Sequence, residues 1–232
     1  MQAADVMTPD VITVTPDTEV REIARLLLEH HISAVPVVDA NRKVLGIVSE
    51  GDLMRRVENA TDQRHSWWLK SIFAAANNAS DYVKSHGRKA KEIMTPDPIT
   101  IDEDKPLYRI AALLEKHHIK RVPVVRDGRL VGIVSRANLL QGFSAAAPDT
   151  DMEATPQQDR EIRDAILKEI NAHTGLMFDR VNVIVNNGVV QLWGLVQNQD
   201  EKMAAQVAAE NTPGVKRIEN NLGFVPLGVG GY

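Results

Sequence analysis

The sequence contains no cysteine among its 232 residues. This absence excludes disulfide bonds, metal sites built from thiolates and a cysteine nucleophile. There is also no run of about 18 apolar residues, the minimum for a membrane-spanning helix. The first five residues, M-Q-A-A-D, lack the basic start and apolar run of a signal peptide. We therefore expect a cytoplasmic protein.

The sequence also lacks the charge and the motifs that would indicate nucleic-acid binding or catalysis. Its net charge is −4, so no general basic field is available to attract nucleic acid. It contains no G-x-S-x-G, Walker A, H-E-x-x-H or G-x-G-x-x-G motif. With 44% hydrophobic and 25% charged residues, the composition is typical of a soluble globular protein. We predict a protein that is not an enzyme.

An internal repeat organises the N-terminal two thirds of the chain. Four blocks recur in the same order, offset by 87 residues for the first three and 86 for the last. The blocks are M-T-P-D at 7–10 and 94–97, H-H-I at 30–32 and 117–119, V-P-V-V at 35–38 and 122–125, and G-I-V-S at 46–49 and 132–135. We interpret residues 5–58 and 91–143 as two copies of one unit, since self-similarity at a fixed period determines the architecture.

Each copy is predicted to be helix, strand, strand, helix, with a short extended lead-in. In the first copy, apolar residues at positions 20, 23, 24, 27 and 28 have helical spacing, and Thr18 is a candidate N-cap. The β-branched run 35–38 and the run 44–48 predict buried strands, and a closing helix is expected from Asp52. About 50 residues make a marginal core, so the two copies should pack together in an α/β (α+β) fold.

The repeated pattern resembles the CBS domain. The matching features are the M-T-P start, the helix ending in H-x-I/V-x-x-V-P-V-V-D, and G-I-V-S-x-x-D opening the last helix. The resemblance implies a tandem pair, or Bateman module, with two clefts related by a pseudo-twofold axis. It also implies a homodimer, for which residues 1–143 should suffice, and an adenosine-containing ligand. Such pairs occur inside inosine monophosphate dehydrogenase too, but the catalytic barrel of that enzyme would not fit in this chain.

Residues 59–90, between the copies, are longer than a simple linker, so we expect a helix there. An apolar stripe would pack on the CBS module or across a dimer. The alternative is a docking surface for a partner or for lipid headgroups, given five basic residues against two acidic ones and the pair Trp67 and Trp68. The stripe consists of Trp68, Ile72, Ala76, Ala79 and Val83, widened by Trp67, Leu69 and Phe73.

The C-terminal residues, after a flexible linker at 144–156, predict a small α-β-β-α-β domain over 157–226. Apolar residues at 162, 166 and 170 mark an amphipathic helix, an alternating strand begins at Val181, and N-N-G at 186–188 predicts a hairpin turn. A helix at 200–211 and a last strand at 215–225 follow. With a loose linker, we expect this domain to be a tethered passenger that has no fixed contact with the repeat.

This segment resembles a BON domain, on N-G-V-V-x-L-x-G-x-V at 187–196 and G-V-x-x-I-x-N-x-L at 214–222. The resemblance implies binding to a phospholipid surface or to a partner protein. Residues 155–226 carry seven Lys or Arg against nine Asp or Glu, so anionic lipid offers little attraction and a protein partner is at least as well supported. Trp193 is interpreted as a packing residue.

The candidate ligand residues begin with the G-I-V-S-x-x-D/N segments. Ser49 and Ser135 stand where a strand gives way to a helix N-terminus, a position that favours phosphate. Asp52 can accept hydrogen bonds from both ribose hydroxyls, whereas Asn138 in the second copy loses that bidentate geometry. Helix capping is the alternative role for both residues.

The CBS resemblance adds further candidates. Arg121 stands where the family places a phosphate-contacting arginine, and the first copy has Ala34 there. Ile12 and Ile99 would enclose the adenine, and Thr18 completes the candidate set. No tightly bound cofactor is expected, and AMP, ADP, ATP or S-adenosylmethionine would act as the regulatory ligand.

Two alternatives stay open at this point. The CBS pair could serve only for dimerisation, with the BON domain binding a partner or lipid. The adjacent histidines at 30–31 and 117–118 could suggest a metal, but neighbours on a helix point about 100° apart, and we interpret them as helix-end residues.

Overall fold

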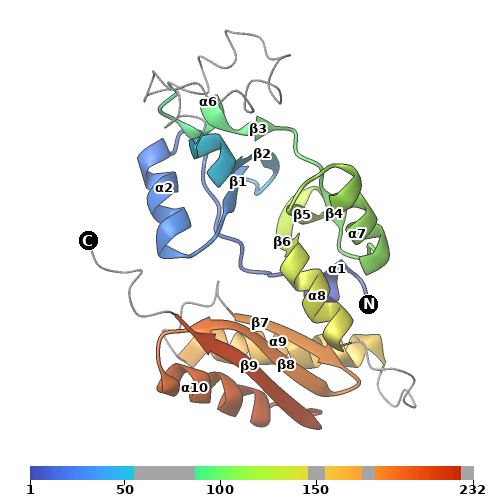
Figure 1. Cartoon of the computed structure of the whole chain (residues 1–232). Coiled ribbons are helices and arrows are strands. Elements are labelled where there is room, and N and C mark those ends of the chain that lie inside the picture. Colours follow the sequence, from blue (N-terminus) through green and yellow to red (C-terminus); the bar gives the residue numbers. More distant parts are fainter. Residues whose placement is uncertain (55–86, 146–154, 174–180, 226–232) are drawn as a thin grey trace. The chain divides into compact units, whose positions relative to one another are not determined.

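The structure is a computed structural model that describes residues 1–54, 87–145, 155–173 and 181–225 (Figure 1). The predicted stripe at Trp67–Val83 lies outside the described residues, as does most of the predicted linker. The chain divides into two compact units. The larger unit contains Met1–Asp10, Thr100–Arg126 and Val131–Tyr232, and the smaller unit contains Val11–Ile99 and Asp127–Leu130.

The smaller unit contains the body of the first copy. Its elements are α2 (Val20–Glu29), β1 (Ala34–Val38), β2 (Val44–Ser49), α6 (Ala90–Ile93) and β3 (Thr95–Pro96). The antiparallel sheet has the order β1-β2-β3, and α2 buries Val20, Ile23 and Leu27 in a core shared with β1. The predicted strands and the predicted helix of this copy are confirmed.

The larger unit contains the body of the second copy, with the N-terminal segment beside it. Its elements are α1 (Ala3–Val6), β4 (Ile101–Asp102), α7 (Leu107–Lys116), β5 (Arg121–Arg126), β6 (Arg129–Ser135, whose first two residues lie in the smaller unit) and α8 (Arg136–Ala145). The sheet order is β4-β5-β6, and β4 pairs in parallel with β5. The buried side chains of α7 repeat the spacing found in α2.

Each lead-in is divided between the two copies. The M-T-P part of the second copy forms β3, which pairs with β2 of the first copy, and Thr8 forms an antiparallel bridge with Ile133 of the second. The later part stays with its own copy, since Val14 pairs with Val37 and Ile101 with Val124. The repeat had assigned each whole lead-in to its own copy, and a sequence pattern carries no information about this exchange.

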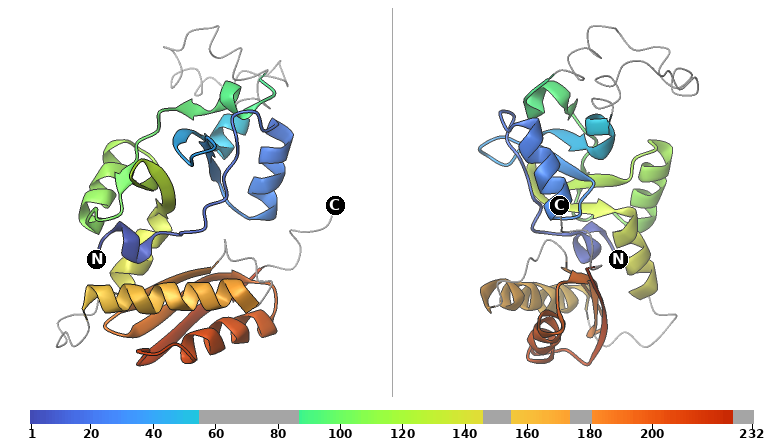
Figure 2. Two further views of the ribbon diagram at one scale, coloured as in Figure 1. Left: turned by 180° about the vertical axis from the view of Figure 1, so that it is seen from behind. Right: turned by 60° about the vertical axis from the view of Figure 1, so that its left-hand side comes forward.

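The C-terminal domain has the predicted α-β-β-α-β order. Its elements are α9 (Pro156–His173), β7 (Val181–Asn186), β8 (Val189–Val196), α10 (Gln199–Glu210) and β9 (Arg217–Phe224). The pair β7-β8 is antiparallel and the pair β8-β9 parallel. Figure 2 shows both helices on one face of this sheet, where Ile166, Val183 and Ala209 meet in the core. Asn187 and Gly188 have φ of 53° and 76°, which confirms the predicted hairpin turn.

Two local predictions are wrong. Thr18 is not the N-cap of α2: Glu19 holds that position without a side-chain cap, and Thr18 Oγ1 accepts a hydrogen bond from the backbone N–H of Thr15 at 3.0 Å. Leu28, which helical spacing assigned to the buried face, is 75% exposed. Three apolar positions suffice to anchor this helix.

The alternating pattern predicted for β7 is wrong, and so is the expectation, drawn from the linker, that the C-terminal domain is a tethered passenger. Residues 181–185 are all buried. Val181, Val183 and Val185 face the core of the C-terminal domain, while β7 also contacts α1 and α8. The second face of β7 is therefore covered by the N-terminal segment and the second copy. The C-terminal domain is docked within the larger unit.

We predict that Gly188→Ala destabilises the protein more than Gly128→Ala. Both glycines have φ of 76° and follow a residue with positive φ in a two-residue hairpin turn, so both variants should lose about 1–2 kcal/mol to backbone strain. A Cβ at Gly188 would in addition lie 3.0 Å from the Gly214 carbonyl oxygen, whereas a Cβ at Gly128 meets nothing within 4 Å. Urea unfolding of the two variants should show a further loss of about 1 kcal/mol at Gly188. Equal losses would show that the crowding has no effect.

Candidate functional site

The first candidate site lies where β2 ends and a helix begins at Glu50; we call it the first junction. Asp52 Oδ2 accepts hydrogen bonds from the Ser49 backbone N–H at 2.9 Å and from Ser49 Oγ at 2.7 Å. Asp52 is 7% exposed. This is one half of a capping box, in which the third helical residue reaches back to the N-cap. The cap uses Oδ2 alone, so it does not engage Oδ1.

The second junction, between β6 and α8, repeats this geometry with an amide. Asn138 Oδ1 accepts from the Ser135 backbone N–H at 2.8 Å and from Ser135 Oγ at 2.6 Å, and the Asn138 N–H donates to Ser135 Oγ at 3.3 Å. Asn138 Nδ2 donates to Thr8 Oγ1 at 3.4 Å. Thr8 is a residue that the sequence reasoning missed, although its return as Thr95 in the repeated M-T-P block was the available signal.

The capping role that the sequence left open is thus present at both junctions, with one adjustment. Serine occupies the N-cap, and Asp52 or Asn138 occupies the third helical position. Capping and ligand binding do not exclude each other at the first junction, because the second carboxylate oxygen of Asp52 lies outside the cap.

Arg121 begins β5, close to the second junction. The backbone N–H of Arg136, the first residue of α8, donates to the carbonyl of Lys120 at 3.2 Å. The start of β5 and the end of β6 therefore lie side by side, with Arg121 half-buried. The first copy has the same arrangement, in which Ala34 pairs with Ser49. Only the second junction has a guanidinium at this position.

The remaining candidates belong to the smaller unit and have less specific surroundings. Ile12 packs against the core formed by α2 and β1, as an ordinary core residue would, and Ile99 is half-buried. The described contacts of Thr18 run to Thr15, and its carbonyl accepts from the Ala90 N–H at 2.8 Å. The structure brings Ser49 and Asp52 into contact, but it gives Thr18 no contact with either.

The turn at Thr18 is fastened by the neighbouring Asp17. Lys89 and Lys91 each place Nζ 2.9 Å from Asp17 Oδ1. The hydrogen bonds from these two lysines lower the pKa of Asp17 to about 2. These ion pairs join the turn that contains Thr18 to the start of α6. The contacts around Thr18 therefore have a structural role.

The histidine pairs stand at helix ends. His30 and His117 are the C-cap residues of α2 and α7, while His31 and His118 have φ of 51° and 52°. Among the described residues, no group of three or more His, Asp or Glu side chains is placed to hold a metal ion. In the same part of the chain, no helix is long and apolar enough to cross a membrane.

We predict that Asp52→Ala lowers the stability of the protein by about 1 kcal/mol, because Ser49 loses the acceptor for both its N–H and its hydroxyl. Asp52→Asn retains an oxygen at the same place, as Asn138 shows in the second copy, and should cost much less. Urea unfolding compares the two variants. Equal losses would mean that the charge matters at this position and that the cap does not.

Two protein families match the chain. The CBS domain family matches residues 3–59 and 90–145, and the BON domain family matches residues 158–226. The CBS domain-containing protein CBSX1, chloroplastic, of Arabidopsis thaliana is 34% identical over 141 residues, covering 57% of this chain and 58% of that protein. CBSX2 of the same plant is 31% identical over 157 residues, covering 63% and 65%. The chain thus spans less than two thirds of the length of these relatives.

A solved structure shows the same likeness in three dimensions. The crystal structure of CBSX2 in complex with AMP is similar with a TM-score of 0.53 and 29% identity, covering 62% of this chain and 96% of that one. The two copies of the repeat fall in the residues matched by the CBS family, and the α-β-β-α-β domain falls in those matched by the BON family. The chain belongs to the CBS-domain proteins, with two CBS domains followed by a BON domain.

Proposed function

We propose that this protein is a non-enzymatic regulatory sensor that binds an adenine nucleotide at its two strand–helix junctions. AMP leads the candidate ligands, with ADP, ATP and S-adenosylmethionine as the others. The observation that carries the proposal is the buried Asp52, whose capping bonds use only Oδ2 at the N-terminal end of a helix. The AMP complex of the similar CBSX2 supports the choice of ligand.

The groups at the first junction suit a nucleoside phosphate. Asp52 Oδ1 would accept from the ribose hydroxyls, because a carboxylate offers several lone-pair sites. The helix N-terminus, with Ser49 beside it, would take the phosphate through backbone N–H groups. Ile12 and Ile99 would cover the adenine with apolar surface. These groups bind and orient a ligand, and the proposal assigns no bond-making step to them.

The second junction offers less to a ribose. Asn138 Oδ1 already accepts two hydrogen bonds, and Nδ2 donates to Thr8. Its advantage is Arg121, whose guanidinium would contact phosphate with a geometry that matches it. We therefore propose two unequal sites, with the first junction dominating ribose recognition and the second junction relying more on phosphate.

A homodimer built through the CBS pair is part of the proposal. Large apolar side chains stand exposed on the helices of both copies. In the larger unit, Tyr108 is 65% exposed, Leu140 69% and Phe143 52%. In the smaller unit, Leu28 is 75% exposed and Met54 is 58% exposed. A symmetric, self-complementary interface is the commonest way to cover such faces.

The BON domain would serve for tethering or interaction. On α10, Met203 and Val207 are 47% and 44% exposed and four residues apart, so they lie on one face of the helix. This apolar pair favours a protein partner over a phospholipid surface for a domain with an acidic balance. The same pair supports the alternative function, in which the CBS pair only dimerises and the BON domain binds a partner protein or a phospholipid surface.

We predict that AMP raises the melting temperature, and that Asp52→Ala weakens AMP binding more than Asn138→Ala does. The reason is that Asp52 has an oxygen outside the cap, whereas the amide of Asn138 is already engaged. A thermal-shift screen with AMP, ADP, ATP and S-adenosylmethionine identifies the ligand, since 100 times the Kd adds about 2.7 kcal/mol of stability. Calorimetric titration then ranks the variants.

Asp52→Asn is the matched control for this titration, because it retains the cap and loses the carboxylate. It should bind AMP about as weakly as Asp52→Ala while remaining close to the natural protein in stability. Equal losses at Asp52 and Asn138 would contradict the unequal sites. If none of the four compounds raises the melting temperature, the sensor function is wrong and the dimerisation and tethering function replaces it.

We predict that the protein is a dimer at micromolar concentration and that the double variant Leu140→Asp, Phe143→Asp is a monomer. Burying two carboxylates without partners costs more than such an interface can offset. Light scattering measures the mass of both forms. Met203→Asp on α10 is the control and should stay dimeric, because it lies on the BON domain. A monomeric natural protein would overturn the proposed dimer.

A further inference from the structure

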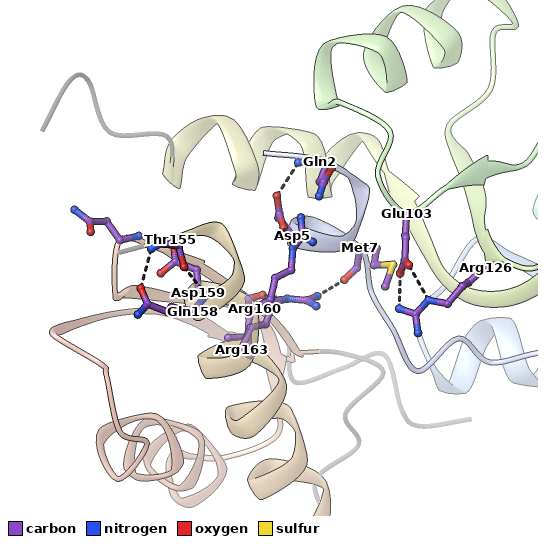
Figure 3. Close-up of polar contacts among 12 residues, drawn as sticks. Gln2, Asp5, Met7, Glu103, Arg126, Thr155, Gln158, Asp159, Arg160 and Arg163 are labelled. Atoms are coloured by element: carbon purple, nitrogen blue, oxygen red, sulfur yellow. Dashed lines mark hydrogen bonds and ion pairs between the residues drawn. The ribbon is translucent and has the colours of Figure 1, made fainter. Parts of the chain in front are cut away.

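A buried arginine joins the BON domain to the N-terminal segment. Arg163, on α9, is 3% exposed. Its Nε donates to the Val183 carbonyl at 2.7 Å, and its Nη2 donates to the Met7 carbonyl at 2.5 Å (Figure 3). Burial lowers the pKa of this guanidinium, while Asp164 and Asp5 raise it. An arginine side chain stays charged under such conditions, so a buried cation is held by two backbone carbonyls.

Further polar contacts surround this arginine. Asn182, on β7, donates to the Val6 carbonyl at 3.1 Å and to Gln141 Oε1 on α8 at 2.8 Å. Asn186 donates to the Ala145 carbonyl, the last of α8, at 2.6 Å. Arg160 pairs with Asp5 at 2.7 Å, as Figure 3 shows. The BON domain thus contacts two elements, the N-terminal segment and α8.

Apolar packing seals the same interface. Ile184 alternates with the core residues of β7 and is nevertheless fully buried, because α1 and α8 cover that face of the strand. Val6 is also fully buried and packs so closely on α8 that a Cβ at Gly142 would lie 2.8 Å from Val6 Cγ1. An interface with a buried cation, buried amides and apolar packing is a specific one.

Both elements held by the BON domain contribute to the second junction, where they meet β6. Thr8 follows Met7, its N–H donates to the Ile133 carbonyl at 3.0 Å, and its hydroxyl accepts from Asn138. Asn138 itself is on α8, one helical turn before Gln141 and Gly142. A displacement of Met7 or of α8 would therefore change the position of Thr8 relative to Asn138.

We propose that the BON domain acts in cis on the second junction, and that Arg163 is a positioning residue that sets the affinity of that junction for AMP. The inference rests on the proposed function, since it names how nucleotide binding at that site is controlled. Coupling between two sites is reciprocal. AMP at the second junction must therefore strengthen the docking of the BON domain by the same factor by which docking strengthens AMP binding.

The test compares the variant Asp52→Ala with the double variant Asp52→Ala, Arg163→Met. Without the Asp52 carboxylate, AMP binding reports on the second junction. Calorimetric titration with AMP should show at least a fivefold loss of affinity, the lower end of typical couplings. With Asp52 intact, the affinity of the first junction should be unchanged. Arg163→Lys should restore only part of the affinity, because one ammonium does not reproduce the fork that bonds two carbonyls.

A second variant guards against simple unfolding of the BON domain. Gln141→Ala removes the acceptor of Asn182 from the CBS side, leaving the BON domain's own contacts untouched, and should also weaken AMP binding at the second junction. Asn171→Ala is the control. It removes an exposed hydrogen bond between α9, the helix of Arg163, and Asp10, and it should not change AMP binding. Hydrogen exchange without ligand should show faster exchange at 6–8 and in α8 for Arg163→Met, with β8 and β9 protected as before.

The outcomes separate the two ideas. If AMP binds and its affinity is the same in the Arg163 and Gln141 variants, the inference is wrong and the nucleotide sensor stands. If the natural protein binds no AMP, the proposed function fails, and the positioning role of Arg163 fails with it. Added AMP should slow exchange at 6–8 and in α8 of the natural protein, and unchanged exchange there would contradict the reciprocal coupling.

Discussion

A methionine packed on a bare glycine connects each CBS copy to the lead-in of the other. Met94 lies against Gly46 on β2, and Met7 lies against Gly132 on β6. In both places a Cβ on the glycine would stand 2.8 Å from the methionine Cγ, which no real packing allows. A copy of about 50 residues has a marginal core by itself. The exchanged lead-ins supply apolar surface and a strand partner at the point where each copy is incomplete.

This constraint also decides where the candidate sites lie. The threonine after each methionine comes to rest beside the strand that ends at the junction, as Thr8 does beside Ile133 and Thr95 beside Ile47. Residues from both copies therefore contribute to each junction, although serine and the Asp or Asn come from one. The two junctions share a backbone geometry and differ in a few side chains, Asp52 against Asn138 and Ala34 against Arg121. Under the proposed function, such a pair would bind one class of ligand with two affinities.

The sequence was sufficient to predict the helices and strands, but it was insufficient to predict which of them contact one another. Repeated motifs predicted the strands of both copies, and the Asn-Gly pair predicted the hairpin, because both depend on local backbone preferences. The cap assigned to Thr18 failed because the helix begins later, and its hydroxyl serves a turn instead. At the candidate site, Ser49, Asp52 and Asn138 were found from their motif. Thr8 was missed although its M-T-P block repeats, because its contact with Asn138 spans 130 residues and the repeat does not indicate which residue it meets.

The docking of the BON domain shows why a loose linker is a poor guide to domain independence. The linker at 144–156 suggested a passenger, yet a buried cation with only backbone acceptors is stable only if the surrounding structure keeps them in place. Arg163 would lose the Met7 acceptor if the domain swung away, and the amide of Asn182 would lose two. Separation would therefore remove these hydrogen bonds and would also expose the apolar side chain of Ile184 to water. Polar groups at this interface thus fix the orientation of the domain while apolar burial holds it. Under the proposed coupling, a small change at Thr8 would therefore alter how firmly the BON domain is held.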